Sequence, residues 1–151
     1  MAVVYYDVTP SSTSGLAVND VIFTATSMAN TGGGYLDSVA CWSLDDQDDA
    51  LDLYFLRSSV AVGAANAAFA PSDANVDEII TKVSFTTGSG WSDANTSLYQ
   101  IKTAAAGDAG MGVYMSNVAS ATNPLIYLVG VMRTTGGWSS GGLKFRIGLA
   151  S

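Results

Sequence analysis

The sequence contains no histidine, a single cysteine, a single glutamate and only six basic residues among its 151. Without histidine, neither a Ser-His-Asp triad nor a Cys-His pair can be assembled. A lone cysteine forms no intrachain disulfide, and zinc ligation by Cys and His is excluded as well. No cofactor motif is present. We therefore expect a protein that binds and holds, and not an enzyme.

Charge of either sign is scarce, at 13% of residues, and the net charge is −7. So few basic residues cannot form the stripe that binds nucleic-acid phosphates, and they do not favour an anionic membrane surface either. No apolar run reaches the roughly 18–20 residues of a membrane span. The start of the chain lacks the basic region of a signal peptide, so we expect synthesis in a cytoplasm.

Hydrophobic residues make up 48% of the chain, in short alternating runs separated by Gly, Ser, Asn and Asp. Such runs predict β-strands separated by turns. The expected strands are 19–26, 35–44, 50–57, 81–87, 98–103, 112–115, 125–133 and 143–149. With one short helix at 71–80, capped by Ser72, they predict a single domain over 1–151. About eight antiparallel strands and no long helix favour an all-β, jelly-roll-like sandwich.

Three local patterns add detail. Residues 125–133 are apolar on both faces, so we expect both faces to be covered. Residues 143–149 alternate, with Lys144 and Arg146 facing outward. The runs at 35–44 and 50–57, joined by an acidic turn, are expected to pair as a hairpin.

Four aspartates, Asp45, Asp46, Asp48 and Asp49, form the one candidate metal site. Neighbouring carboxylates can supply several of the six to eight oxygens that calcium takes. The spacing is not that of an EF-hand, and Asp is also a common turn residue. A solvated turn and a calcium loop are the two alternatives.

Aromatic residues supply the candidate binding groups. Trp91 and Trp138 lie in Gly- and Ser-rich turns, where a Trp packs in the core, anchors a protein interface or stacks on a sugar. Trp42 and Cys41 lie within a strand and are expected in the core.

The apolar start of the chain, Val3, Val4, Tyr5 and Tyr6, gives a second set of interface candidates. It is either an N-terminal arm over 1–8 that adds to a neighbouring sheet or the first strand of the domain's own sheet.

The order of several segments is similar to that of a known group. These segments are Asn19-Asp20-Val21, Leu36-Asp37-Ser38-Val39, Asp45-Asp46-Gln47, Leu51 to Leu56, Ala65 to Phe69, Ser72-Asp73-Ala74, Ile80 to Phe85, Leu125 to Thr134 and Leu143 to Leu149. In this order the chain resembles the small virion structural proteins of tailed bacteriophages. The likeness spans about residues 16 to 150 through short apolar patterns.

This resemblance implies a β-sandwich that decorates or cements the capsid surface of the virion. Its partners would be the major capsid protein and further copies of itself, as a homotrimer at local threefold positions. In that role, the doubly apolar strand 125–133 is a candidate for burial between subunits. The alternative is a carbohydrate- or receptor-binding module of a phage tail or fibre, with Trp91 and Trp138 as its platform.

Overall fold

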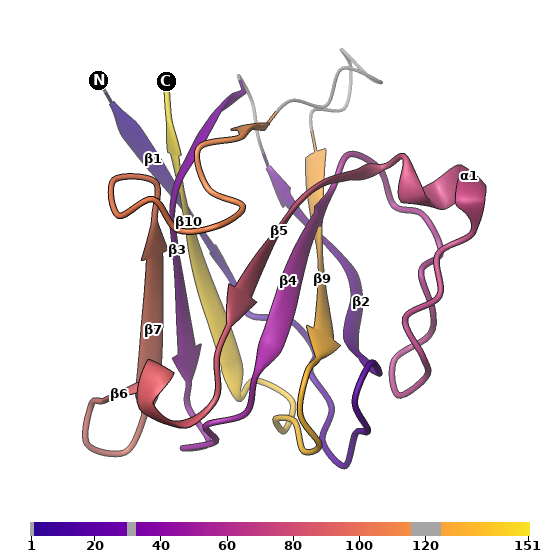
Figure 1. Ribbon diagram of the computed structural model, residues 1–151, viewed down its shortest axis with the longest axis vertical. Coiled ribbons are helices and arrows are strands. Elements are labelled where there is room, and N and C mark those ends of the chain that lie inside the picture. Colours follow the sequence, from indigo (N-terminus) through magenta and orange to yellow (C-terminus); the bar gives the residue numbers. More distant parts are fainter. Residues whose placement is uncertain (1, 30–32, 116–124) are drawn as a thin grey trace.

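The computed structural model describes residues 2–29, 33–115 and 125–151. Two antiparallel sheets pack face to face, which confirms the predicted all-β sandwich (Figure 1). The first sheet holds β1 (Val3–Val8), β10 (Leu143–Ala150), β3 (Gly34–Ser43), β7 (Leu98–Thr103) and β6 (Ser92–Asp93) in that order, with β8 (Tyr114–Met115) also paired to β3. The second sheet holds β2 (Val21–Ala29), β9 (Leu125–Met132), β4 (Leu51–Leu56) and β5 (Ile79–Phe85).

Within the described part of the chain, eight strands have six residues or more: seven lie at predicted positions and the eighth is β1, whereas the predicted strand 112–115 shortens to the two-residue β8. Along the chain these long strands alternate between the two sheets, except that β4 and β5 are neighbours in one sheet. This alternation produces the crossed connections of a double-sheet jelly roll, so the jelly-roll-like prediction is confirmed. The sheets are named below by size, the six-stranded sheet and the four-stranded sheet.

The main core lies between the sheets and follows the two-residue period of the strands. Three phenylalanines meet there: the Phe145 ring centroid lies 5.9 Å from that of Phe23 and 6.4 Å from that of Phe85. Gly130 on β9 faces the same core, and a Cβ at that position would lie 2.4 Å from the Phe23 ring. A glycine is therefore required there for Phe23 to pack.

A second apolar cluster covers the other side of the four-stranded sheet. It contains Val21, Leu56, Val62, Val129 and Val131. Val62 belongs to residues 57–70, named here the covering segment. Phe69, in the same segment, stacks on Tyr54 of β4 at 4.5 Å between ring centroids.

Strand β9 is thus buried on both faces, as predicted. The residues over its outward face belong to the chain's own covering segment, so the expectation that a neighbouring subunit buries this strand is corrected.

One other expectation needs correction. The runs 35–44 and 50–57 form β3 and β4, which lie in different sheets, so they are not a hairpin. Turn residues look alike whether the chain folds back or crosses between sheets. The predicted short helix is confirmed as a single turn, α1 (Asp73–Val76), with Ser72 at its N-cap as expected, but the Ser72 side chain makes no capping hydrogen bond. A short 3₁₀ turn, η1 (Gly88–Gly90), precedes β6.

Candidate functional site

Of the three roles expected for Trp91 and Trp138, the structure shows core packing. Trp138 is fully buried, and its indole Nε1 donates to Ser43 Oγ at 2.9 Å. Trp91 is also buried, donates to the Asp49 carbonyl and lies 6.4 Å from Trp138 between ring centroids. Both therefore pack in the core at one end of the sandwich, and neither offers a surface platform for a sugar or a subunit. Trp42, expected in the core, lies half-exposed on the outer face of the six-stranded sheet.

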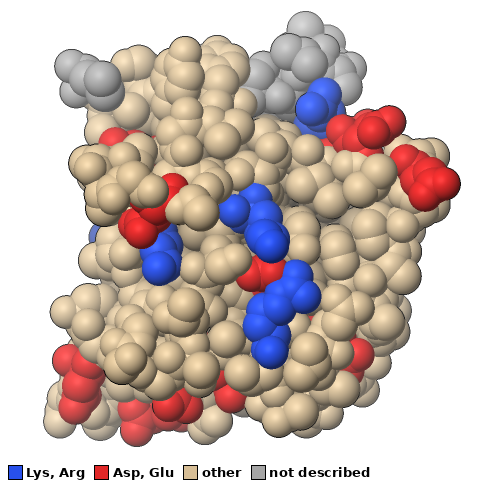
Figure 2. Space-filling model, in the orientation of Figure 1, with Lys and Arg blue, Asp and Glu red and all other residues tan. Residues whose placement is uncertain are grey.

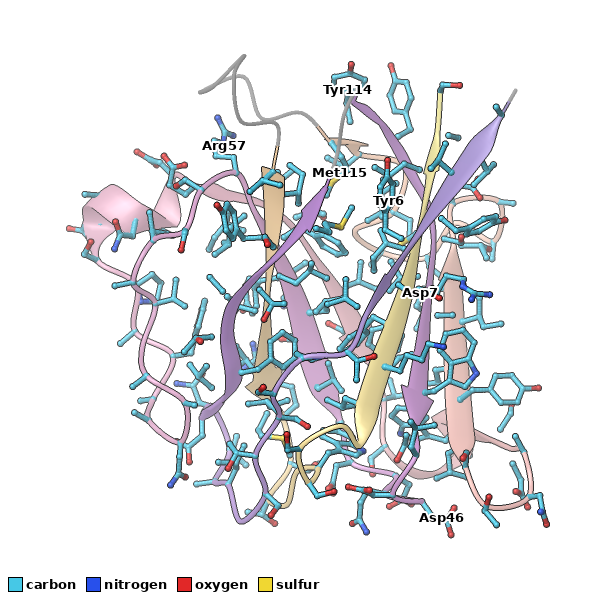
Figure 3. The ribbon with its side chains drawn as sticks, turned by 180° about the vertical axis from the view of Figure 1, so that it is seen from behind. Tyr6, Asp7, Asp46, Arg57, Tyr114 and Met115 are labelled. Carbon is cyan, nitrogen blue, oxygen red and sulfur yellow. The ribbon has the colours of Figure 1, made fainter. Side chains whose placement is uncertain are left out.

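The four aspartates of the β3–β4 connection are turn residues. Asp45 Oδ2 accepts hydrogen bonds from the Ser139 backbone N and Oγ, both at 2.7 Å. Asp49 Oδ2 accepts from the Gly137 N–H at 3.0 Å. Asp46 has a positive φ of 57° and lies at the lower tip of the molecule (Figure 3).

Asp48 contributes its carbonyl oxygen, which accepts from the Thr87 hydroxyl. Among the described residues no group of three or more His, Cys, Asp or Glu is placed to hold a metal ion. The β3–β4 connection therefore crosses from one sheet to the other, and its aspartates bind it to the loop before β10. Acidic side chains gather along this lower margin in Figure 2.

The N-terminal candidates form β1, which pairs with β10 of the same chain from Val3 opposite Ala150 to Val8 opposite Phe145. This is the arrangement of the second alternative, a first strand of the domain's own sheet. Tyr6 faces inward and packs against the main core, while Tyr5 is exposed on the outer face.

The outer face of the six-stranded sheet carries a shallow hollow of about 450 Å³. Ala40 on β3 lies at its centre, because its cross-strand neighbours are Arg146 on β10 and Ile101 on β7. Those two larger side chains form its sides, together with Tyr5 and Trp42. A small residue ringed by large ones makes a socket for a projecting group.

Charge on this face is paired across two strands, β1 and β10. Arg146 donates two hydrogen bonds to the Asp7 carboxylate, at 2.7 and 2.9 Å, and Lys144 Nζ lies 4.0 Å from the same group. The hydrogen bond from Arg146 holds the pKa of Asp7 below its usual value, although partial desolvation opposes the shift. Lys144 Nζ and Arg146 Cζ lie 5.6 and 5.7 Å from the Trp42 ring centroid, which are cation–π distances.

Sequence reasoning did not place Trp42, Ala40 and Ile101 on the outer face of this sheet. The signal was present in the alternation of β3, where Val39 and Cys41 face the core and Ala40 and Trp42 face outward. Cys41 itself is fully buried, as predicted, and burial raises the pKa of its thiol.

No protein-family model matches this sequence, and no curated protein matches it either. None of the helices in the described ranges is both long enough and apolar enough to pass through a bilayer. The proposal for function therefore rests on the fold and on the outer face of the six-stranded sheet.

Proposed function

We propose that this chain is a non-enzymatic capsid decoration protein of a tailed bacteriophage. It binds the lattice of the major capsid protein at the virion surface as a homo-oligomer. The observation that supports this proposal is the difference between the two outer faces. The chain covers part of one with its own residues 57–70, and it leaves aromatic and aliphatic side chains exposed on the other.

A decoration protein needs a broad contact repeated over many equivalent sites, and it needs no reacting group. Broad shallow surfaces with an apolar centre and a polar rim suit that use. On the outer face of the six-stranded sheet, Ile101 and Tyr5 supply exposed apolar area, while Asp7 and Arg146 form a neutralised pair at the side.

Co-sedimentation with assembled capsids tests the proposal. The capsids are assembled from the major capsid protein of a phage whose genome encodes this chain. Wild type is expected to pellet with them, and Ile101→Asp is expected to bind at least about tenfold more weakly, because it places an unpaired charge in the contact. Val18→Asp is the matched control, since Val18 and Ile101 are 55% and 54% exposed and Val18 lies outside this sheet.

No pelleting of wild type would contradict the proposal, and so would equal losses for the two variants. The resemblance implies three copies per unit, and the molar mass of the purified chain tests that number.

A second candidate function is glycan or receptor recognition in the same hollow. Its lining combines the Trp42 and Tyr5 rings with the hydroxyls of Ser38 and Thr103, a mixture that suits a polyol. A glycan array decides between the two functions: Trp42→Ala should abolish any signal, whereas an array with no signal favours the capsid.

A further inference from the structure

Three of the four sheet edges are hydrogen-bonded at one or two points to other segments of the chain. Beside β2, Val21 N donates to the Ala67 carbonyl at 2.8 Å, which seats the covering segment on that edge. Beside β5, the Thr81 hydroxyl donates to the Gly110 carbonyl at 2.8 Å. Beside β7, the short strand β6 pairs at one end and Asp108 accepts from the Thr103 N–H at the other.

The fourth edge belongs to β1. Among the described residues, the backbone of Val3–Val8 pairs only with β10. Seen from behind, β1 lies in front of β10 with no other ribbon over it (Figure 3). The strand contains no Pro, no Lys and no bulge, which are the devices that usually protect an edge.

The ladder fixes which backbone groups face outward. Ser151 N donates to the Ala2 carbonyl at 3.1 Å, so these two residues form a hydrogen-bonded pair. Hydrogen-bonded and non-hydrogen-bonded pairs alternate along an antiparallel ladder. Val4, Tyr6 and Val8 therefore bond to β10. The N–H and C=O groups of Val3, Tyr5 and Asp7 point away from it, to the open edge.

We propose that this open edge pairs with β1 of a second copy, antiparallel and around a twofold axis, to join two six-stranded sheets into one. The occupant is a second copy because the strand is complementary to itself. The register centred on Tyr5 is the one that pairs all three outward residues, with Tyr5 opposite Tyr5 and Val3 opposite Asp7 of the second copy.

Side chains agree with that register. On the inner face, Val4 lies opposite Tyr6 of the second copy, so the apolar surface of Val4, 52% exposed in one chain, is covered. On the outer face the two Tyr5 rings are direct neighbours, a favourable cross-strand pair. The acidic residue of β1, Asp7, meets Val3 and not a second carboxylate.

Each chain has one such edge, so the pairing ends at a dimer, whereas a trimer needs another surface. The inference deepens the self-association within the proposed function but does not depend on capsid binding. A dimer that ignores capsids removes only the proposed function, and a monomer that binds capsids removes only this inference.

Sedimentation velocity across the micromolar range tests the pairing on the full chain. Wild type is expected to show a monomer–dimer equilibrium. Val3→Pro removes an outward N–H at the first residue of the strand, where Pro is tolerated. Compared with Val3→Ala, it should weaken the dimer by about tenfold, because each dimer loses two hydrogen bonds. Thermal unfolding confirms that both variants fold.

Cysteine cross-linking tests the register. Tyr5→Cys places two thiols across a hydrogen-bonded pair, with Cα atoms about 5.5 Å apart, within the range of a disulfide. Oxidised glutathione should therefore convert it to a covalent dimer. Val4→Cys is the matched control, because Val4 and Tyr5 are 52% and 58% exposed but Val4 faces Tyr6 of the second copy.

Wild type, whose one thiol is the buried Cys41, serves as the blank. A wild type that stays monomeric throughout the concentration range overturns the inference, and so does cross-linking of Val4→Cys as fast as Tyr5→Cys.

Discussion

Each outer face of the sandwich carries one aspartate held by one arginine and one lysine, and the two groups differ in burial. On the four-stranded sheet, Asp52 contacts Arg133 and lies 3.5 Å from Lys82 Nζ. On the six-stranded sheet, Asp7 holds Arg146 and Lys144. The Asp52 side chain is 3% exposed and that of Asp7 is 43% exposed.

The contrast follows from position in the sheet and from what lies over it. Asp52 is on β4, a central strand, and accepts a further hydrogen bond from Ser84 on β5. Asp7 is on β1, an edge strand, where its side chain remains 43% exposed. We therefore expect the Asp52 group to stabilise the four-stranded sheet and the Asp7 group to contribute little, so that the six-stranded sheet keeps a face for contact. The following predictions test this difference.

The largest difference is expected for apolar truncations. Leu56→Ala empties a fully buried site under the covering segment and should cost about 2–4 kcal/mol of unfolding free energy. Ile101→Ala, on the open face, should cost less than about 0.5 kcal/mol. Urea denaturation measures both. Equal losses would mean that the open face is as well packed as the covered one.

Asp52→Asn should lower the unfolding free energy by about 2 kcal/mol, because a buried ionic acceptor is lost. Both cations are partly exposed and can turn to water, which keeps the cost below the full penalty for a buried pair. The same denaturation series measures it, with Ser89→Ala on the exposed turn η1 as a control expected to change little. A neutral result would show that the cluster adds nothing to stability.

Phe69→Ala removes the ring that stacks on Tyr54 and should cost about 1–2 kcal/mol. The covering segment should loosen first, because Phe69 N also bonds to the Asn19 carbonyl at its end. Amide hydrogen exchange should therefore quicken at Val21, which bonds to this segment, and not at β10. Uniform quickening over both sheets would contradict a separate covering unit.

The smallest effect is expected for Asp7→Asn, a few tenths of a kcal/mol at neutral pH, since exposed ion pairs contribute little. The folded pKa of Asp7 is lowered, so its contribution is present above the unfolded pKa of about 4 and disappears as pH falls through the folded value. The gap between wild type and variant should close in acid and in high salt. A gap that widens toward low pH has the wrong sign for this pair.

Strand positions and their inward or outward faces were predictable, because the two-residue period is written locally. Val83 and Phe85 are buried and Lys82 and Ser84 are not, as the alternation in 81–87 indicates. The site was not predictable in the same way. Trp138 is buried against Ser43, and Trp42 lies on the outer face beside Arg146. Each partner is about 95 to 104 positions away in the sequence, so neither environment can be seen in the local pattern.

Local order along the chain was therefore enough to predict most of the strands, an all-β sandwich and the lack of the histidine that common catalytic triads need. Only the tertiary structure decided the contacts. It placed β3 and β4 in separate sheets, tied the acidic turn to the loop before β10 and laid residues 57–70 over part of one face. Among the described residues, it left the outer edge of β1 without a backbone partner. These outcomes rest on contacts between residues tens of positions apart. Their energy exists only when both sheets are assembled, so no local pattern encodes them.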